Sequence, residues 1–388
     1  MAFFFAVALE TGHRFFLPVI ANSHSVATVY NAHTYTEIRQ MKKSTSSRFA
    51  KFFLGCAIGL LSTQSMAATY VAWPTTSTVV TADQASTFGE NLSGLFYQPA
   101  AASNPAVLWA VQNSPSKLYS LTWNGSNYVK NTANNWGSGK TLRYPNGTGA
   151  PDAEGVTMAE LTSPAVYVAS ERDGSGSSRL SVLRYDTSAT GTALNATNEW
   201  NLTADLPKVD ANAGLEAITW VPDSYLQASQ FIDENTRLPY DPANYPSHGT
   251  GLFFVGLEAN GQIYAYALNQ SGSSYVRVAT FASGQPQVMD LSFDRDNNIL
   301  WAACDNNCSG KTTVLSVDTT AGSPTKGKFV VRKGYNRPGS MSNMNNEGIA
   351  IAPESECINK LKTFIWADDA QDNNHALRRG TISCGPLF

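Results

Sequence analysis

A short phrase built from small and acidic residues recurs five times along the chain. Its copies follow one another at intervals of 61, 62, 73 and 58 residues, counted at the second residue of each copy. The copies are Leu92–Leu95, Ala153–Val156, Leu215–Ile218, Val288–Leu291 and Asn346–Ile349. Between them, short β-branched and aromatic runs alternate with clusters of Gly, Asn, Asp and Ser, which is typical of strands joined by tight turns. A repeat of this length with several short strands per unit predicts a β-propeller.

Each repeat unit is expected to contain three strands, here named A, B and C in chain order. Strand A begins with the recurring phrase, strand B is an apolar run, and strand C follows after a polar turn. A fourth strand is expected in most units, for example over 140–144 and 275–281. The expected strands are, unit by unit, 94–97, 107–111 and 117–122; 155–158, 165–169 and 179–185; 217–221, 252–255 and 262–268; 291–293, 299–303 and 312–317; and 348–352, 364–367 and 376–382.

The fifth unit runs out of chain after its strand C, whereas residues 70–80 form a spare strand before the first unit. We expect this segment to complete the last blade as its outer strand, because closing the ring removes free sheet edges. The sequence therefore predicts an all-β fold with a single propeller of five blades over residues 68–388. A six-bladed ring is the alternative if the long insertion at 222–250 hides a blade.

The first 67 residues have the layout of a secretory signal peptide rather than of a folded domain. Basic residues after Met41 precede the apolar run 52–61, and Ser65–Ala67 offers a small-residue cleavage site. The apolar run is too short to span a bilayer, which takes about 20 residues. We expect residues 1–67 to be an upstream extension and signal peptide, with Met41 as the initiator. The mature protein is then periplasmic or extracellular, without stable membrane insertion.

Removal of residues 1–67 leaves 21 basic and 28 acidic residues, a net charge of −7. This balance argues against nucleic acid as a partner, because no basic stripe remains to meet phosphates. Only His248 and His375 remain of the five histidines. A zinc site built on histidines, or a serine–histidine–aspartate triad, therefore has almost nothing to draw on. We expect a monomer whose ligand is a small molecule or a glycan.

Four cysteines remain after cleavage, and an even number in an exported chain favours disulfides. Three pairings are possible, and we favour Cys304–Cys308 with Cys357–Cys384. Cys357 lies between strands A and B of the fifth unit and Cys384 follows strand C. Both therefore emerge at the same edge of the blade.

The acidic residues of different units are expected to share one face of the ring. Neighbouring strands of a blade are antiparallel, so the start of strand A and the end of strand B lie on the same side. Strand A begins with a glutamate in the second, third and fifth units. In the first unit Ser93 takes this position, and in the fourth Met289 takes it and is followed by Asp290. Strand B ends on a polar residue four places after an aromatic one. These residues are Glu154, Glu216, Glu347 and Asp290 at the starts, and Asn113, Glu171, Glu258, Asp305 and Asp368 at the ends.

Crowded carboxylates need either protons or a cation between them. Two carboxylates about 6 Å apart repel by roughly 3 kcal/mol at an effective dielectric constant of about 20. Ligands that offer only oxygen suit Ca²⁺, or Mg²⁺ as the alternative, and do not suit zinc. The competing interpretation is that the acids cap strand-edge amides and hold turns. The insertion at 222–250 joins strands A and B, so we expect it and His248 on the opposite face.

With these phrases in view, the chain resembles secreted propellers of the phytase-like family, described as having esterase-like activity, and the related SdiA-regulated type. The shared order of motifs is Leu92–Leu95, Asp152–Gly155 with Ser170–Glu171, Leu215–Ile218, and Glu347–Ala350 with Asp368–Asp369. The chain departs from the pattern at Ala217, where glycine is usual. It also offers few basic residues near the acidic face: Arg172, Lys311, Arg378 and Arg379.

Two functions remain open at this point. The first is an exported metal-dependent hydrolase of an ester or phosphoester, in which Glu154, Glu216, Glu347 and neighbouring acids hold the ion. Glu171 or Asp368 would then act as general base, with Arg172 and His375 as contacts to the anionic part of the substrate. The second is a non-catalytic binding propeller that recognises a glycan, a peptide or an envelope component, with any metal purely structural.

Overall fold

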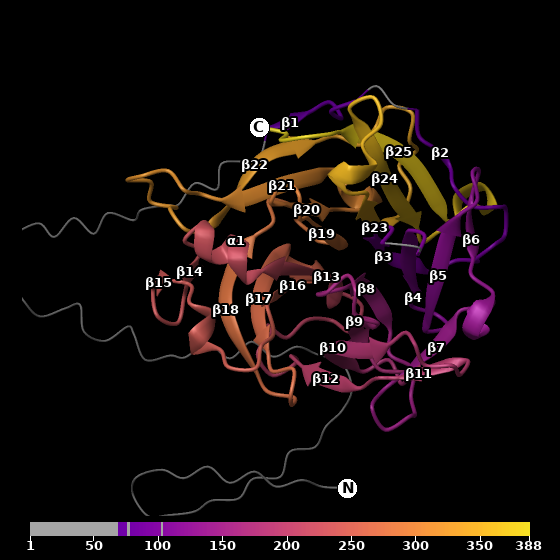
Figure 1. The fold of residues 1–388 in the computed structure, drawn as a ribbon, viewed down its shortest axis with the longest axis horizontal. Coiled ribbons are helices and arrows are strands. Elements are labelled where there is room, and N and C mark those ends of the chain that lie inside the picture. The colour runs from indigo at the N-terminus through magenta and orange to yellow at the C-terminus, as the bar shows by residue number, and fades with distance from the viewer. Residues whose placement is uncertain (1–68, 76–77, 102–103) are drawn as a thin grey trace, which may run out of the picture. The chain divides into compact units, whose positions relative to one another are not determined.

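The computed structural model describes residues 69–75, 78–101 and 104–388, and it places their strands in five sheets around a common centre (Figure 1). In sheet order from inside to outside, blade 1 is β3 (Leu92–Gln98), β4 (Val107–Gln112), β5 (Lys117–Trp123), β7 (Lys140–Arg143) and β11 (Ala193–Asn195), with β6 (Tyr128–Lys130) beside β5. Blade 2 is β8 (Ala153–Thr157), β9 (Ala165–Arg172), β10 (Ser178–Asp186) and β12 (Asn198–Asn201). Blade 3 is β13 (Leu215–Pro222), β16 (Gly251–Leu257), β17 (Gln262–Leu268) and β18 (Tyr275–Ala282).

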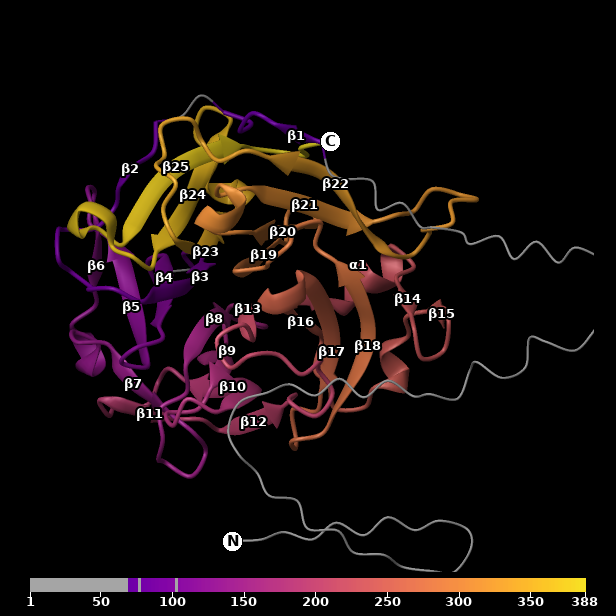
Figure 2. The same ribbon diagram turned by 180° about the vertical axis from the view of Figure 1, so that it is seen from behind.

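Blade 4 is β19 (Asp290–Asp294), β20 (Ile299–Ala303), β21 (Thr312–Val317) and β22 (Phe329–Tyr335), with β1 (Tyr70–Val71) outside it. Blade 5 is β23 (Asn346–Ile351), β24 (Leu361–Asp368), β25 (Leu377–Ser383) and β2 (Val80–Thr81). The five-bladed β-propeller predicted from the repeat is therefore confirmed, and Figure 2 shows the same ring of blades from behind. The signal peptide predicted before Tyr70 lies outside the described residues.

Ring closure differs from the prediction in one respect. Residues 70–80 were expected to form one outer strand of the last blade, but they contribute to two blades. Tyr70 and Val71 pair parallel to β22 of blade 4, and Val80 and Thr81 pair antiparallel to β25 of blade 5. Trp73 explains the division, because its indole packs between the two blades and donates a hydrogen bond to the Thr381 carbonyl at 3.0 Å. The chain must leave blade 4 to bury this side chain.

The insertion at 222–250 forms no sixth blade. It contains α1 (Asp223–Ala228), the short pair β14 (Ile232–Asp233) and β15 (Leu238–Pro239), and the 3₁₀ turn η2 (Pro242–Asn244). The Glu234 amide donates to the Val278 carbonyl at 2.9 Å, and the Thr280 amide donates to the Glu234 carboxylate at 3.0 Å. The insertion thus covers the outer edge of β18, which would otherwise present unpaired backbone groups.

Small residues allow the innermost strands to approach one another closely around the centre. A Cβ atom added at Gly94 would lie 2.4 Å from the Glu154 carbonyl oxygen, and one at Gly155 would lie 2.9 Å from the Glu216 carbonyl oxygen. Each of these glycines therefore packs against the backbone of the next blade. This explains in physical terms why the recurring phrase contains glycine.

A β-bulge stands at each glutamate of the recurring phrase. In blade 2, Ala153 pairs with Ser170 and Gly155 with Ala169, so Glu154 is an extra residue without a partner in β9. The same shift surrounds Glu216 and Glu347 in their blades. Because a bulge turns its side chain out of the regular alternation, the three glutamates are aimed away from the packed blade faces.

Both predicted disulfides are present. Cys304 pairs with Cys308, with their Cα atoms 6.0 Å apart, and Cys357 pairs with Cys384 at 6.2 Å. None of the helices in the described part of the chain has the length and apolar character needed to cross a membrane.

Candidate metal centre

Five carboxylates from blades 2 and 3 meet where β8 and β13 begin and β9 and β16 end. They form two groups of three, and within each group one ligand oxygen per residue lies within 4.8 Å of the others. Glu171 belongs to both groups, so the two are continuous. We call these residues the acidic mouth: Asp152, Glu154, Glu171, Glu216 and Glu258.

Burial makes the acidic mouth costly to ionise. Glu154 and Glu216 are 2% and 5% exposed, and burial raises the pKa of both carboxyls well above the usual range, with further increases from neighbouring carboxylates. Burial also raises the pKa of Glu171 to about 7, although hydrogen bonds from the Gly214 amide and with Glu216 lower it. Protons or a cation must therefore occupy this cluster at neutral pH.

Few neighbouring groups compensate the charge. Asn113 donates through Nδ2 to both oxygens of Glu154, at 3.2 and 3.3 Å. Arg172 forms an ion pair with Asp152, and its Nε atom lies 3.5 Å from Glu171 Oε2. One guanidinium thus faces five carboxyl groups, too little positive charge to balance them if all were ionised.

A second pair of acids comes from blade 5. Asn345 donates through Nδ2 to Glu347 at 2.9 Å and to Asp369 at 3.1 Å. Burial raises the pKa of Glu347 well above its usual range, and the charges of Asp369 and Glu154 add to the increase. The Glu347 charge in turn acts on Glu216. The three glutamates that begin strands β8, β13 and β23 therefore influence one another across the centre of the ring.

Two residues predicted as metal ligands are engaged elsewhere. Asp290 is fully buried, and its two oxygens accept from the backbone amides of Leu291 at 2.8 Å and Ile349 at 2.6 Å. This carboxylate occupies the place of the glycine in three other phrases and of Ala217 in the fourth, and it joins blade 4 to blade 5. The structure does not bring it together with the acidic mouth, and it fits the interpretation of acids as backbone caps.

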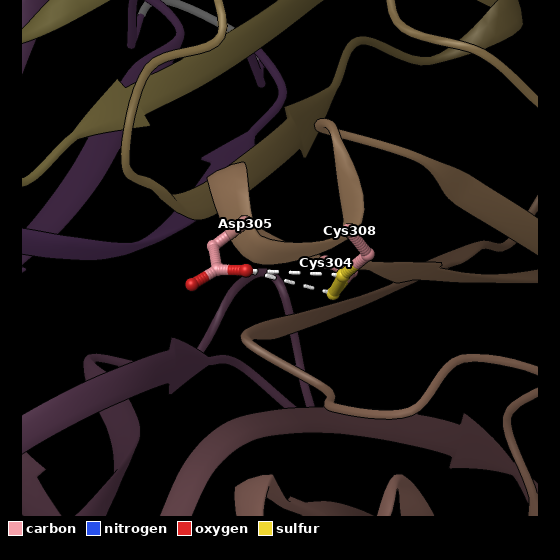
Figure 3. A group of neighbouring side chains, drawn as sticks. All are labelled: Cys304, Asp305 and Cys308. Atoms are coloured by element: carbon pink, nitrogen blue, oxygen red, sulfur yellow. Dashed lines mark hydrogen bonds between the residues drawn. A yellow bond between two sulfur atoms is a disulfide. The ribbon is translucent and has the colours of Figure 1, made fainter.

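Asp305 lies beside the first disulfide, at the end of β20 (Figure 3). It caps the 3₁₀ turn η4 (Asn306–Cys308) by accepting from the Asn307 amide at 2.9 Å. Its Oδ1 atom lies 3.7 Å from Cys304 Sγ and 3.8 Å from Cys308 Sγ. Burial raises the pKa of Glu258, and the charge of Asp305 adds to the increase, so Asp305 borders the acidic mouth without belonging to either group of three.

Asp368 and His375 lie in a separate network of blade 5. Asp368 is fully buried, accepts from Arg378 at 3.1 Å and from the Asp372 amide at 3.0 Å, and has a pKa raised by burial to about 6. Its Oδ1 atom has no hydrogen-bond partner among the described residues. His375 Nδ1 lies 3.1 Å from Asp83 Oδ1. Asp368 is therefore held within the turn that joins β24 to β25, whereas His375 lies against Asp83 in the segment that follows β2.

A largely buried arginine lies at the other end of the inner strands. Arg295 donates to the carbonyls of Met158 and Ala159, and its guanidinium lies 4.6 Å from the centre of the Trp220 ring. Burial lowers its pKa to about 10. On the same side, His248 Nε2 lies 3.0 Å from both Asp223 Oδ2 and Tyr240 Oη, which ties together the insertion.

Sequence reasoning selected Glu154, Glu171, Glu216 and Glu258 but omitted Asp152 and Asp369 from the site. Asp152 lies two residues before Glu154, and Asp369 directly follows Asp368. A search for acids on either side of the strand ends would have found them.

No protein-family model matches the chain, and no curated protein matches it. Among solved structures, a chain from "Crystal structure of Nidogen/Laminin Complex" aligns over 78% of this chain and 96% of that chain, with 10% identity and a TM-score of 0.35. This similarity is too low to support an argument, and the fold assignment depends on the five sheets described above.

Proposed function

We propose that the protein is an exported, metal-dependent hydrolase of an ester or phosphoester. The observation that carries the proposal is the pair of overlapping carboxylate groups that share Glu171. Two ionised carboxylates at 4.8 Å repel by about 3.5 kcal/mol at an effective dielectric constant of about 20. Five such groups beside one arginine favour a divalent cation as a permanent partner.

The donor set fits a hard ion. It consists of carboxylates, with no histidine or cysteine in either group, and this chemistry suits Ca²⁺, or Mg²⁺ as the alternative. We assign Glu154, Glu216 and Glu258 as the residues that would hold the ion. When bound, such an ion polarises an ester or phosphoryl oxygen and lowers the pKa of a bound water.

Glu171 is the residue best placed to act as general base. Its Oε1 atom accepts from the Gly214 amide at 2.7 Å, which fixes the carboxylate between the two groups. Arg172 follows it in the chain and has a partly exposed side chain, so we assign it to the anionic part of the substrate. Asp368 and His375 lie in the separate network of blade 5, and we assign them to positioning the turn that joins β24 to β25.

The motif order shared with the phytase-like family supports the same reaction class. Two disulfides are compatible with an exported protein. The scarcity of basic side chains near the acidic mouth argues for a substrate with fewer negative charges than a hexakisphosphate. We therefore expect simple esters or phosphomonoesters to be turned over.

The test is a screen of chromogenic carboxyl and phosphate esters with the purified protein, after treatment with a chelator and after addition of Ca²⁺ or Mg²⁺. We expect turnover with the metal and none without it. Glu216→Gln should abolish this turnover, whereas Glu160→Gln, a matched change outside the acidic mouth, should not. Absence of turnover at every metal loading would exclude the hydrolase.

A further inference from the structure

A second hollow opens between blades 2 and 3, outside the acidic mouth. It has a volume of about 220 Å³, and its lining includes Glu160, Tyr167, Arg184, Trp220, Thr250 and Gln270. Glu160 and Thr250 belong to connections between the first and second strands of their blades. The hollow therefore opens on the side of the ring where Arg295 lies, and the hydrolase proposal does not use it.

Two cross-blade hydrogen bonds hold this hollow open in a fixed shape. Tyr167 donates from its hydroxyl to Gln270 Oε1 at 2.7 Å, and Thr250 donates from its hydroxyl to Glu160 Oε1 at 2.5 Å. Each bond joins a residue of blade 2 to one of blade 3. A pocket formed in this way needs little rearrangement to accept a ligand.

Opposite charges line the hollow without neutralising each other. Among the described residues, no hydrogen bond or ion pair is made by the Arg184 guanidinium, and none joins it to Glu160. Burial raises the pKa of the Tyr167 hydroxyl, and the charges of Arg184 and Glu160 act on it in opposite directions. Both charged groups therefore lie near this hydroxyl while remaining apart from each other.

The aromatic rings of Tyr167 and Trp220 line the hollow but do not expose a ring face on which a ligand could stack. Tyr167 and Trp220 are 5% and 6% exposed, and Arg295 already covers one face of the Trp220 ring. Little ring surface is left for the face of a sugar. The volume is also below the roughly 300–1,000 Å³ of pockets that hold drug-sized ligands. The hollow thus suits a small ligand held mainly through its charges.

We propose that this hollow binds a zwitterionic α-amino acid, with its carboxylate on Arg184 and its ammonium group on Glu160. An arginine fork matches the two oxygens of a carboxylate. The free oxygen of Glu160 accepts from the ammonium group, while its other oxygen keeps the bond from Thr250. Hydrophobic wall atoms of Tyr167 and Trp220 contact the ligand side chain.

The experiment is calorimetric titration of the full-length protein with each free L-amino acid, followed by the N-acetyl and methyl-ester derivatives of the tightest ligand. Each derivative removes one charge, and we expect each to bind about tenfold or more weakly. Arg184→Gln should weaken binding of the free amino acid, but it should not weaken binding of the methyl ester any further, because the ester has no carboxylate for Arg184 to contact. Glu160→Gln should weaken binding of the free amino acid, but it should not weaken binding of the N-acetyl derivative any further, because that derivative has no ammonium group.

Arg237→Gln, a change at an exposed arginine that does not line the hollow, is the matched control and should leave binding unchanged. Chelator should also leave it unchanged, which separates this site from the acidic mouth. Lack of binding by every amino acid at millimolar concentration would overturn the proposal. So would binding of a neutral monosaccharide that neither charge variant affects.

Discussion

Neutralising Glu171 should stabilise the metal-free protein at alkaline pH, although it removes a residue of the proposed site. The pKa of Glu171 is raised to about 7 in the folded protein, against 4.5 as its ordinary value. Between these values the folded state holds a proton that the unfolded state has released, so stability falls as pH rises. One proton over this interval corresponds to about 3 kcal/mol of unfolding free energy.

Glu171→Gln removes this ionisation and keeps an oxygen that accepts from Gly214. Without metal, the variant should match the parent near pH 4.5 and exceed it at pH 8 by up to about 3 kcal/mol, or on the order of 5–10 °C in melting temperature. Added Ca²⁺ should reverse the order at pH 8, because the ion stabilises only the parent strongly.

Thermal unfolding followed by circular dichroism, in chelator and in calcium across this pH range, measures the effect. Asp210→Asn, a change at an exposed carboxylate outside the acidic mouth, serves as control and should follow the parent throughout. The reasoning is refuted if Glu171→Gln leaves the pH dependence of the metal-free melting temperature unchanged, or if it lowers stability at pH 8 without metal.

Three further predictions concern the propeller itself. Replacing Cys357 and Cys384 by serine should lower the unfolding free energy by about 3.5 kcal/mol, which is the chain-entropy value for a loop of 27 residues. Denaturant titration measures this loss, and an unchanged unfolding free energy would show that the disulfide does not stabilise the protein. Asp290→Asn should cost about 1–3 kcal/mol in the same assay, because an NH₂ group replaces one of the two oxygens that accept from buried backbone amides, while metal affinity stays unchanged. A loss of affinity without a loss of stability would make Asp290 a metal ligand. Gly94→Ala should destabilise by about 1–3 kcal/mol or more, since its Cβ would lie 2.4 Å from the Glu154 carbonyl oxygen. Gly339→Ala, with open space around the added atom and no positive φ, is the comparison for the steric contribution, and equal stability of both variants would contradict close packing of the inner strands.

The repeat of the opening phrase was enough to predict five blades, and antiparallel pairing was enough to place Glu154, Glu171, Glu216 and Glu258 together. Both inferences depend only on chain order and strand direction. The bulges at the strand starts could not be predicted, because the register of a strand depends on partners that are distant in sequence. The division of residues 70–80 between two blades has a similar origin, since it depends on where Trp73 finds a buried site.

Asp290 shows the limit of reasoning from position within a repeat. It stands one residue after the position of the glutamates in the other phrases, and a neighbouring strand offers its amide to this carboxylate. Asp305 likewise caps a turn that no sequence pattern distinguished from an open site. Carboxylates at the equivalent strand ends Asp305 and Glu258 therefore serve as a backbone cap in one blade and as part of the acidic mouth in another.

The most direct measurement is anomalous diffraction from a crystal of the protein equilibrated with calcium. We expect one peak bounded by the carboxylates of Glu154, Glu216 and Glu258, with loss of that peak in Glu216→Gln. It is contradicted if millimolar calcium leaves no peak there and the carboxyls are instead hydrogen-bonded to one another.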